Sequence, residues 1–234
     1  MQFIGLFLFF KRLAMVMSSS RSCPNGERCY SGKYQDGHAV YFYDDTDEGR
    51  IYAGKFWFRR VYYALPKARV TEIACGLFGN GKKEGRWTFT YRGYGVSRKL
   101  AAEYSEGHRS GFYNYRSVCR ARSLGFTKGV TTLSVTFRNG HIEGTVSCML
   151  NNETLTGSYD SEGRPDGKWT MNAATSHSHR ICHETWVHGE CMSFDATDVT
   201  TGDKTDMKTH LPDILMSIFY NECKPLEAIM KRGS

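Results

Sequence analysis

A short pattern of small, aromatic and turn-forming residues recurs along the chain and predicts β-hairpins. Each copy reads small residue, any residue, aromatic residue, any residue, acid or amide, glycine, and complete copies span 32–37, 76–81, 102–107 and 135–140. Another copy, at 157–163, carries one extra residue before its glycine. Alternation with a period of two is typical of a β-strand, and Asn-Gly, Asp-Gly or Glu-Gly favours a tight turn. Each copy therefore predicts the end of one strand and the turn that follows.

A second glycine and a second run of alternating residues follow most of these turns. The paired glycines are Gly81 and Gly85, Gly107 and Gly111, Gly140 and Gly144, and Gly163 and Gly167. Two and four residues later stand Trp87 and Phe89, Tyr113 and Tyr115, Val146 and Cys148, and Trp169 and Met171. This spacing predicts a returning strand with one apolar face. We expect the second glycine to let an aromatic ring of the neighbouring unit lie against bare backbone.

The spacing of the turn glycines predicts about seven units between residues 26 and 200. The turns fall at Gly37, 81, 107, 140 and 163, and a degraded copy ends at Gly189. Because the first gap is about twice the others, we place a half-unit, 54–58, inside it with Arg59 at the turn position; the surplus near 116–131 predicts a longer loop. Phe, Tyr and Trp are together as numerous as Leu, Ile and Val, which favours strands. The fold class predicted is all-β, an elongated antiparallel meander of about seven β-hairpin repeats with a short C-terminal helical cap.

The last part of the chain changes from strand to helix periodicity. Ile214, Leu215, Ile218 and Phe219 are spaced for one helix face, and Pro212 stands in the first turn. We expect this helix to end near Cys223, where Lys224-Pro225 breaks it, and a second short helix over 226–231. A stack of hairpins leaves apolar surface at its last member, which the helix is expected to cap. The domains predicted are a leader or disordered segment (1–25), the repeat array (26–200) and the cap (201–234).

The N-terminal segment is apolar but fits no standard targeting signal. The run Phe3–Phe10 precedes Lys11-Arg12, which reverses the charge order of a secretory signal, and it is too short to span a bilayer. Cys23 invites comparison with a lipid-modified cysteine, although 20–22 fit such a cleavage site poorly. We interpret the segment as a leader outside the fold, or as the result of a start codon placed before Met15 or Met17. The predicted location is cytoplasmic, with export or lipid anchoring through this segment as the alternative.

The repeat resembles the MORN repeat, the membrane occupation and recognition nexus. Its units read tyrosine-x-glycine-x-aromatic, a basic glycine-bearing turn, and a second aromatic strand, and the best matches here are 157–169 and 76–87. The chain is most similar to divergent bacterial MORN-variant proteins described as antitoxin components, and the resemblance covers about three quarters of it. The resemblance implies a hairpin array and a protein partner, with an antitoxin-like role as one form. The family name also implies a membrane surface as an alternative partner.

Basic residues that follow the turn glycines are the predicted binding site. They are Lys82, Lys83, His108, Arg109, His141 and Arg164, which the repeat register places in a row along one edge. The net charge of +7 permits an acidic protein or an anionic membrane surface, whereas the scattering of the charges argues against nucleic acid. The most basic stretch also contains Arg86, Arg92 and Arg98 interleaved with Trp87 and Tyr91. We expect its rings to pack the shared face and its charges to be solvated, with lipid or single-stranded nucleic acid as the alternative ligands.

Residues 177–191 hold the densest group of possible metal ligands. Cys182, His188 and Cys191, with His179, could in principle meet around zinc, and a small metal-dependent hydrolase is the alternative function they suggest. Paired knuckles are missing, however, so we expect no metal and no cofactor. The acids at 44–48 end in Gly49 and predict a solvated hairpin loop. No nucleophile elbow, phosphate loop or zinc-protease motif occurs, so a non-enzymatic interaction module is predicted.

Overall fold

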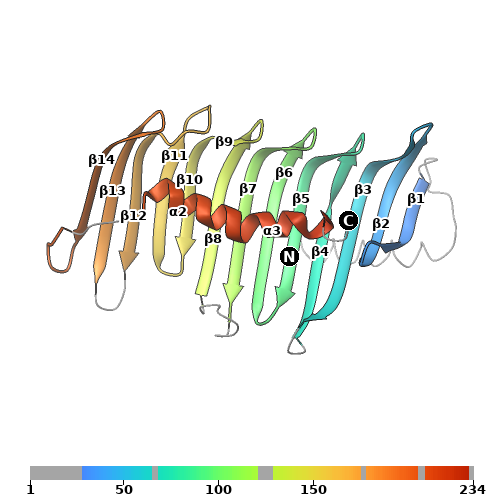
Figure 1. Ribbon diagram of the computed structural model, residues 1–234, viewed down its shortest axis with the longest axis horizontal. Helices are drawn as coiled ribbons and strands as arrows, with labels where there is room; N and C mark the ends of the chain where they lie inside the picture. The colour runs from blue at the N-terminus through green and yellow to red at the C-terminus, as the bar shows by residue number, and fades with distance from the viewer. Residues whose placement is uncertain (1–27, 65–67, 121–128, 175–177, 205–208, 232–234) are drawn as a thin grey trace, which may run out of the picture.

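The chain forms one long antiparallel sheet crossed by a single helical segment (Figure 1). The computed structural model describes residues 28–64, 68–120, 129–174, 178–204 and 209–231. The sheet has 14 strands, and successive strands are neighbours, with the short β9 paired to β8 beside the main path. The strands are β1 (Arg28–Tyr34), β2 (Gly37–Thr46), β3 (Gly49–Ala64), β4 (Ala68–Gly79), β5 (Lys82–Gly93), β6 (Val96–Ser105), β7 (His108–Cys119), β8 (Gly129–Arg138), β9 (His141–Ile142), β10 (Gly144–Leu150), β11 (Glu153–Tyr159), β12 (Gly167–Ala174), β13 (His179–Val187) and β14 (Glu190–Asp198). The all-β meander is confirmed.

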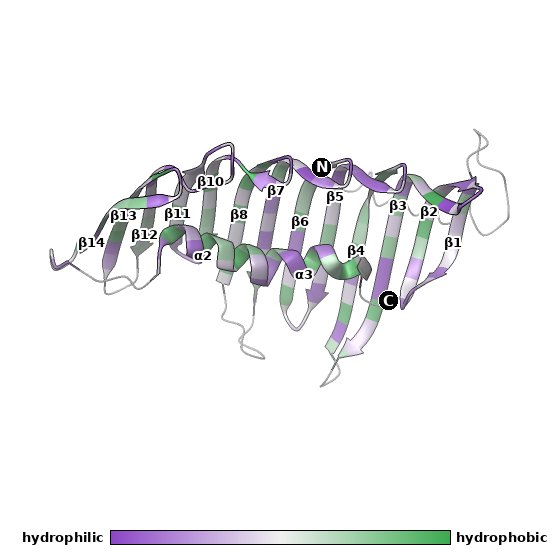
Figure 2. Ribbon diagram, turned by 45° about the horizontal axis from the view of Figure 1, so that its top comes forward, coloured by the Kyte–Doolittle hydropathy of each residue, from purple (hydrophilic) through white to green (hydrophobic). Residues whose placement is uncertain are grey.

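The alternation along each strand separates the sheet into two faces (Figure 2). On one of them, called the helix face, the repeat aromatics are buried: Trp87, Trp169 and Tyr113 have no exposed surface, and Phe89, Tyr104, Phe137 and Tyr159 are nearly as well covered. Phe78 is half-buried against the same cluster. The opposite surface, called the open face, carries mostly Thr, Ser, Lys and Arg from the intervening positions. The repeat aromatics are therefore packing residues of the core, as predicted.

The glycine that accepts a ring is not the second glycine, as expected, but the small residue that opens the motif, where that residue is glycine. A Cβ on Gly76 would lie 2.2 Å from the ring of Trp87, and one on Gly157 would lie 2.1 Å from Trp169, so the first glycine of the motif is the one that accepts the ring. The second glycines, Gly85 and Gly167 among them, have φ of +60° and +76°. Gly85 and Gly167 are therefore needed for a left-handed backbone in the first part of β5 and β12, and not to make room for a ring.

The first hairpin lies at the opposite edge from the one that the glycine spacing suggested. Gly81 donates its N–H to the carbonyl of Tyr52 (2.9 Å), which places the β4–β5 turn beside the β2–β3 turn at Asp47-Glu48. The β1–β2 turn, Gln35-Asp36, is therefore at the other end of the strands, and Gly37 begins β2. Arg59 lies inside β3 and forms no turn. The motif specifies a hairpin but not an edge, so the assigned half-unit was wrong.

The C-terminal segment is one continuous helical stretch, which corrects the predicted break. It runs through α2 (Leu211–Ile218), a π-helical turn η1 (Phe219–Cys223), α3 (Lys224–Glu227) and a 3₁₀ turn η2 (Ala228–Lys231). Lys224 donates its N–H to the carbonyl of Phe219, five residues back. The wider turn accommodates Pro225, which lacks an N–H and would clash with the preceding turn of a regular α-helix.

The helix lies along the sheet and does not cap its end. Its start contacts β11 and β12, and its last turns contact β5 and β4, so it runs back over the array (Figures 1 and 2). Leu211, Leu215 and Leu226 are buried against the helix face. Phe219 packs its ring 5.4 Å from that of Tyr113, measured between centroids. The apolar surface that the helix covers is the aromatic face between β4 and β12, not the last hairpin.

The loop expected near 116–131 is the link between β7 and β8, of which 121–128 lie outside the described residues, as does the predicted leader.

The described cysteines are all free, and Cys119, Cys148, Cys182 and Cys223 are buried.

We predict that Trp87→Ala and Trp169→Ala each lower the free energy of unfolding by about 3 to 5 kcal/mol, because each ring is fully buried against a glycine. Thermal and urea denaturation measure the change. Tyr63→Ala is the matched control, since this ring is 75% exposed and its loss should cost less than about 0.5 kcal/mol. Equal stability of the two Trp variants and the control would contradict the packing role.

Candidate functional site

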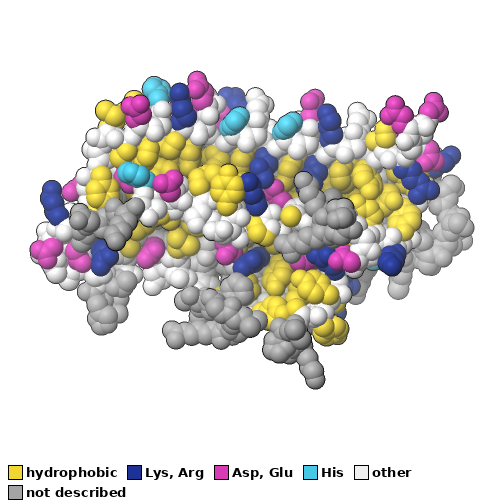
Figure 3. Space-filling model, in the orientation of Figure 1, with side chains coloured by type: hydrophobic (Ala, Val, Ile, Leu, Met, Phe, Trp, Pro, Cys, Tyr) yellow, Lys and Arg dark blue, Asp and Glu magenta, His cyan; other side chains and the backbone are white. Residues whose placement is uncertain are grey.

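The predicted binding residues begin at turns that stack along one edge of the sheet. Gly107 donates its N–H to the carbonyl of Lys83 (2.9 Å), and Gly140 donates to the carbonyl of Arg109 (3.0 Å). We call this the turn edge, and Figure 3 shows charged and histidine side chains along it, at the top of the view. Lys82, His108 and His141 are exposed there. Backbone hydrogen bonds between successive turns hold these side chains in the expected row.

Two of the six predicted binding residues point to the helix face instead. The guanidinium of Arg109 donates to the carboxylate of Glu227 on α3, with Nε 2.9 Å from Oε1. Burial opposes the charge of Arg109, but the hydrogen bond and ion pair with Glu227 outweigh it and raise the pKa of Arg109. The ammonium of Lys83 lies 4.8 to 5.1 Å from the ring centroids of three core aromatics. Both cations therefore stabilise the fold.

Arg164 remains on the turn edge but is paired within its own turn. Its guanidinium lies 2.9 Å from Asp160 and 3.0 Å from Glu162. The backbone N–H of Arg164, with its guanidinium, lowers the pKa of Asp160 to about 2. The same edge has a shallow hollow lined by Ser105, Glu106, His108, Ser110 and Asn139. Lys82, His108 and His141 are thus separated by acidic and neutral groups, and the edge is not a continuous basic row.

A denser group of cations lies on the open face, over β3 to β7. We call this group the basic face; its members are Arg59, Arg69, Arg86, Arg92, Lys99 and Arg116. All except Lys99 are exposed, and in the described part of the chain none of the five arginines forms an ion pair. Lys99 stands directly opposite Arg116 across β6 and β7. Burial, followed by the nearby charge of Arg86, lowers the pKa of Lys99. Like charges are therefore held close together here.

The predicted basic stretch is divided between the two faces. Arg86 and Arg92 belong to the basic face, whereas Arg98 lies over the ring of Tyr91 and 3.3 Å from Glu222 of the helix. Beside the basic face runs a row of small residues, each opposite the next across neighbouring strands: Thr88, Ala101, Asn114, Ser134, Ser147, Thr156 and Thr170. The sequence analysis did not predict the basic face and the row of small residues as one surface, because their members come from separate repeats. The pattern that could have revealed it is that these residues occupy the strand positions that alternate with the buried aromatics.

The possible ligands at 177–191 do not meet as a zinc site. His179 hydrogen-bonds Asn172 and His183 hydrogen-bonds Thr170. His188 stands in the last turn, 3.5 Å from Asp160, and Cys182 is buried in the core. His177 lies outside the described residues. Successive side chains of a strand point to opposite faces, so residues that are close in the sequence lie on opposite sides of the sheet.

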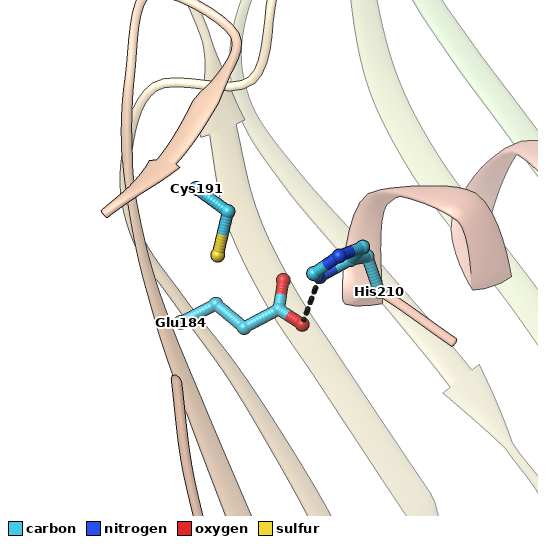
Figure 4. A group of neighbouring side chains, drawn as sticks. All are labelled: Glu184, Cys191 and His210. Carbon is cyan, nitrogen blue, oxygen red and sulfur yellow. Dashed lines mark hydrogen bonds and ion pairs between the residues drawn. The ribbon is translucent and has the colours of Figure 1, made fainter. Parts of the chain in front are cut away.

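Two members of that segment, Cys191 and Glu184, meet His210, which lies outside it; neither Glu184 nor His210 was predicted as a ligand. Cys191 on β14 and His210 before α2 both point toward Glu184 on β13 (Figure 4). Their possible ligand atoms all lie within 4.8 Å of one another. Glu184 has no exposed side-chain surface, and its carboxylate accepts the N–H of Leu211, which begins the helix. Sequence reasoning could not bring His210 here, because a 26-residue separation and the helix placement intervene.

The acids at 44–48 form the exposed β2–β3 turn and its flanks, as expected for a solvated hairpin. Asp45 pairs there with Arg28 and Arg50.

No protein-family profile and no curated protein matches the chain. Among the described residues, no helix is long and apolar enough to cross a membrane.

We predict that Arg109→Met lowers the free energy of unfolding by about 2 kcal/mol, because it leaves the largely buried Glu227 carboxylate without its cation. Lys82→Met, an exposed change on the same edge, should cost less than about 0.5 kcal/mol. Denaturant titrations compare the two. If Glu227→Gln restores most of the lost stability in the Arg109→Met background, the cost comes from the orphaned charge; a loss that is independent of Glu227 would refute this role.

Proposed function

We propose that the protein is a non-enzymatic binding module that docks the acidic surface of a protein partner on the basic face. The observation that carries this proposal is the group of exposed arginines that form no ion pair in the described part of the chain, although Arg86 stands opposite Glu103 on β6. Because Lys99 faces Arg116, part of the repulsion within the group would be relieved by an anionic ligand. The same charges steer an acidic partner toward the sheet.

The composition of the open face favours a protein over other anions. Five of the six cations are arginines, and Trp57 and the exposed Tyr63 lie on the same face of β3. Arg, Tyr and Trp are the residues that most often carry binding energy at protein interfaces. Repeat arrays also present extended surfaces over which a partner can lie. An antitoxin-like role rests on the resemblance of the repeats alone.

An anionic phospholipid surface is the second candidate. Val61 and Tyr63 are exposed at the end of β3, and Tyr63 stands opposite Arg69 on β4. Exposed apolar residues beside cations are typical of proteins that lie on membrane interfaces.

A charge-neutralised variant tests both candidates. Arg59→Gln, Arg92→Gln and Arg116→Gln are combined, and binding is measured to poly-L-glutamate and to phosphatidylcholine vesicles containing phosphatidylserine. We expect wild-type protein to bind polyglutamate, and the triple variant to bind about tenfold or more weakly, since each exposed charge contributes about 0.5 to 1 kcal/mol. Melting curves should be unchanged.

The control replaces the exposed residues of the turn edge through Lys82→Gln, His108→Gln and His141→Gln, which removes one lysine charge and two imidazoles. This variant should bind polyglutamate like the wild type. A loss confined to the turn-edge variant would move the binding site there and overturn the assignment. Binding to the vesicles but not to polyglutamate would favour the lipid candidate, and binding to neither would reject both.

A further inference from the structure

Among the described residues, two carboxylates, those of Glu72 and Glu184, are fully buried, and their surroundings differ. Glu72 has no exposed side-chain surface and accepts hydrogen bonds from the guanidinium of Arg60, with Nε 2.9 Å away. Glu184 is equally buried, yet in the described part of the chain no Lys or Arg lies within ion-pair distance of it. Its one titratable cation there is His210, with Nδ1 3.1 Å from Oε1. A buried carboxylate needs a compensating charge, and an imidazole supplies one only when it is protonated.

Neutral donors hold the Glu184 carboxylate in place without supplying that charge. The indole Nε1–H of Trp186 donates to Oε2 (2.8 Å), and the backbone N–H of Leu211 lies 3.2 Å from each oxygen. These contacts fix the direction of the carboxylate toward His210. Outer hydrogen bonds of this kind orient the ligands of a metal in proteins.

Cys191 completes a mixed set of donors around the same point. Its sulfur, the imidazole and the carboxylate lie within 4.8 Å of one another (Figure 4). Cys191 stands opposite Trp186 at a register shift between β13 and β14, where the ladder is irregular. Burial, followed by the charge of Glu184, raises the pKa of this thiol. A divalent cation would reverse that electrostatic balance and favour the thiolate.

We propose that Glu184, Cys191 and His210 form a site for a divalent transition-metal ion of the zinc class. Thiolate, imidazole and carboxylate are ligands that Zn²⁺ accepts, and three protein ligands leave one position for water. The His210 side chain is 52% exposed, so solvent can reach that position. On binding, the thiol proton is released to solvent and the imidazole coordinates in its neutral form.

The site would join the last hairpin to the start of the helix. Glu184 is on β13, Cys191 on β14, and His210 immediately precedes α2. A metal bound there stabilises the seating of the helix on the sheet, because it binds the folded arrangement and not the unfolded chain. This proposal is independent of the basic face, which lies on the other side of the sheet.

Cobalt and zinc titrations of the full chain test the site. We expect one equivalent of Co²⁺ to give a thiolate-to-cobalt charge-transfer absorption, and Zn²⁺ to displace it and raise the melting temperature. Trp186, whose ring centroid is 5.3 Å from that of His210, should report the same event by fluorescence. Cys191→Ser should abolish the absorption, and His210→Ala should weaken Co²⁺ affinity by more than about tenfold, since even outer-shell changes cost that much.

Two control variants separate this site from general metal binding by the chain. His183→Ala removes a histidine that is bonded to Thr170 on the open face, and should leave Co²⁺ binding intact. His188→Ala removes a histidine of the last turn, which lies 3.5 Å from Asp160, and should also leave it intact. Circular dichroism without metal checks that each variant folds. Absence of the charge-transfer band in the wild type, or retention of Co²⁺ affinity in both ligand variants, would overturn the proposal.

Discussion

A single-layer β-sheet can form a hydrophobic core only if a second layer covers one of its faces. Here that layer is a helix that lies lengthwise over the aromatic face, from β12 back to β4. The repeats supply one continuous band of rings because glycines of positive φ, such as Gly81, Gly107 and Gly140, form the turns and the strands that follow alternate with period two. The helix can cover that band because its apolar stripe continues through a π-helical turn past Pro225. Repeats and helix are therefore interdependent, and the array is not simply a sum of hairpins.

Charged groups fix where the helix sits, since apolar contacts alone would allow it to slide along the sheet. Glu184 accepts the N–H of Leu211 at the start of the helix, Tyr115 donates to Glu222 near its middle (2.6 Å), and Arg109 pairs with Glu227 near its end. The first contact starts from β13 and the other two start from β7, and the three reach successive turns of the helical stretch. Buried polar pairs contribute little net stability but penalise alternative placements, which leave a charge without its partner. The register of helix on sheet follows from these contacts.

The sequence specified hairpins better than it specified their arrangement. Asn80-Gly81 and Glu106-Gly107 have the left-handed pair of residues that a two-residue turn requires, so their hairpins follow from local chemistry. The same chemistry does not say which edge a turn occupies, and Gly37 was assigned to the wrong one for that reason. Helical periodicity likewise predicted an amphipathic helix but not the surface it covers. The meeting of Cys191 with His210 depends on that placement, so no local pattern could have predicted it.

The position of the helix also decides which surfaces are left for recognition. On the helix face, the rings that would otherwise attract a partner are occupied by Leu211, Leu215 and Phe219, and Arg109 and Lys83 are engaged there as well. The turn edge keeps separate charges, several of them paired within their own turns. The open face has no such cover from the helix, and the strand period collects arginines there from β3 to β7. A partner that follows charge would therefore meet the sheet from the side opposite the helix, where docking requires no displacement of the core.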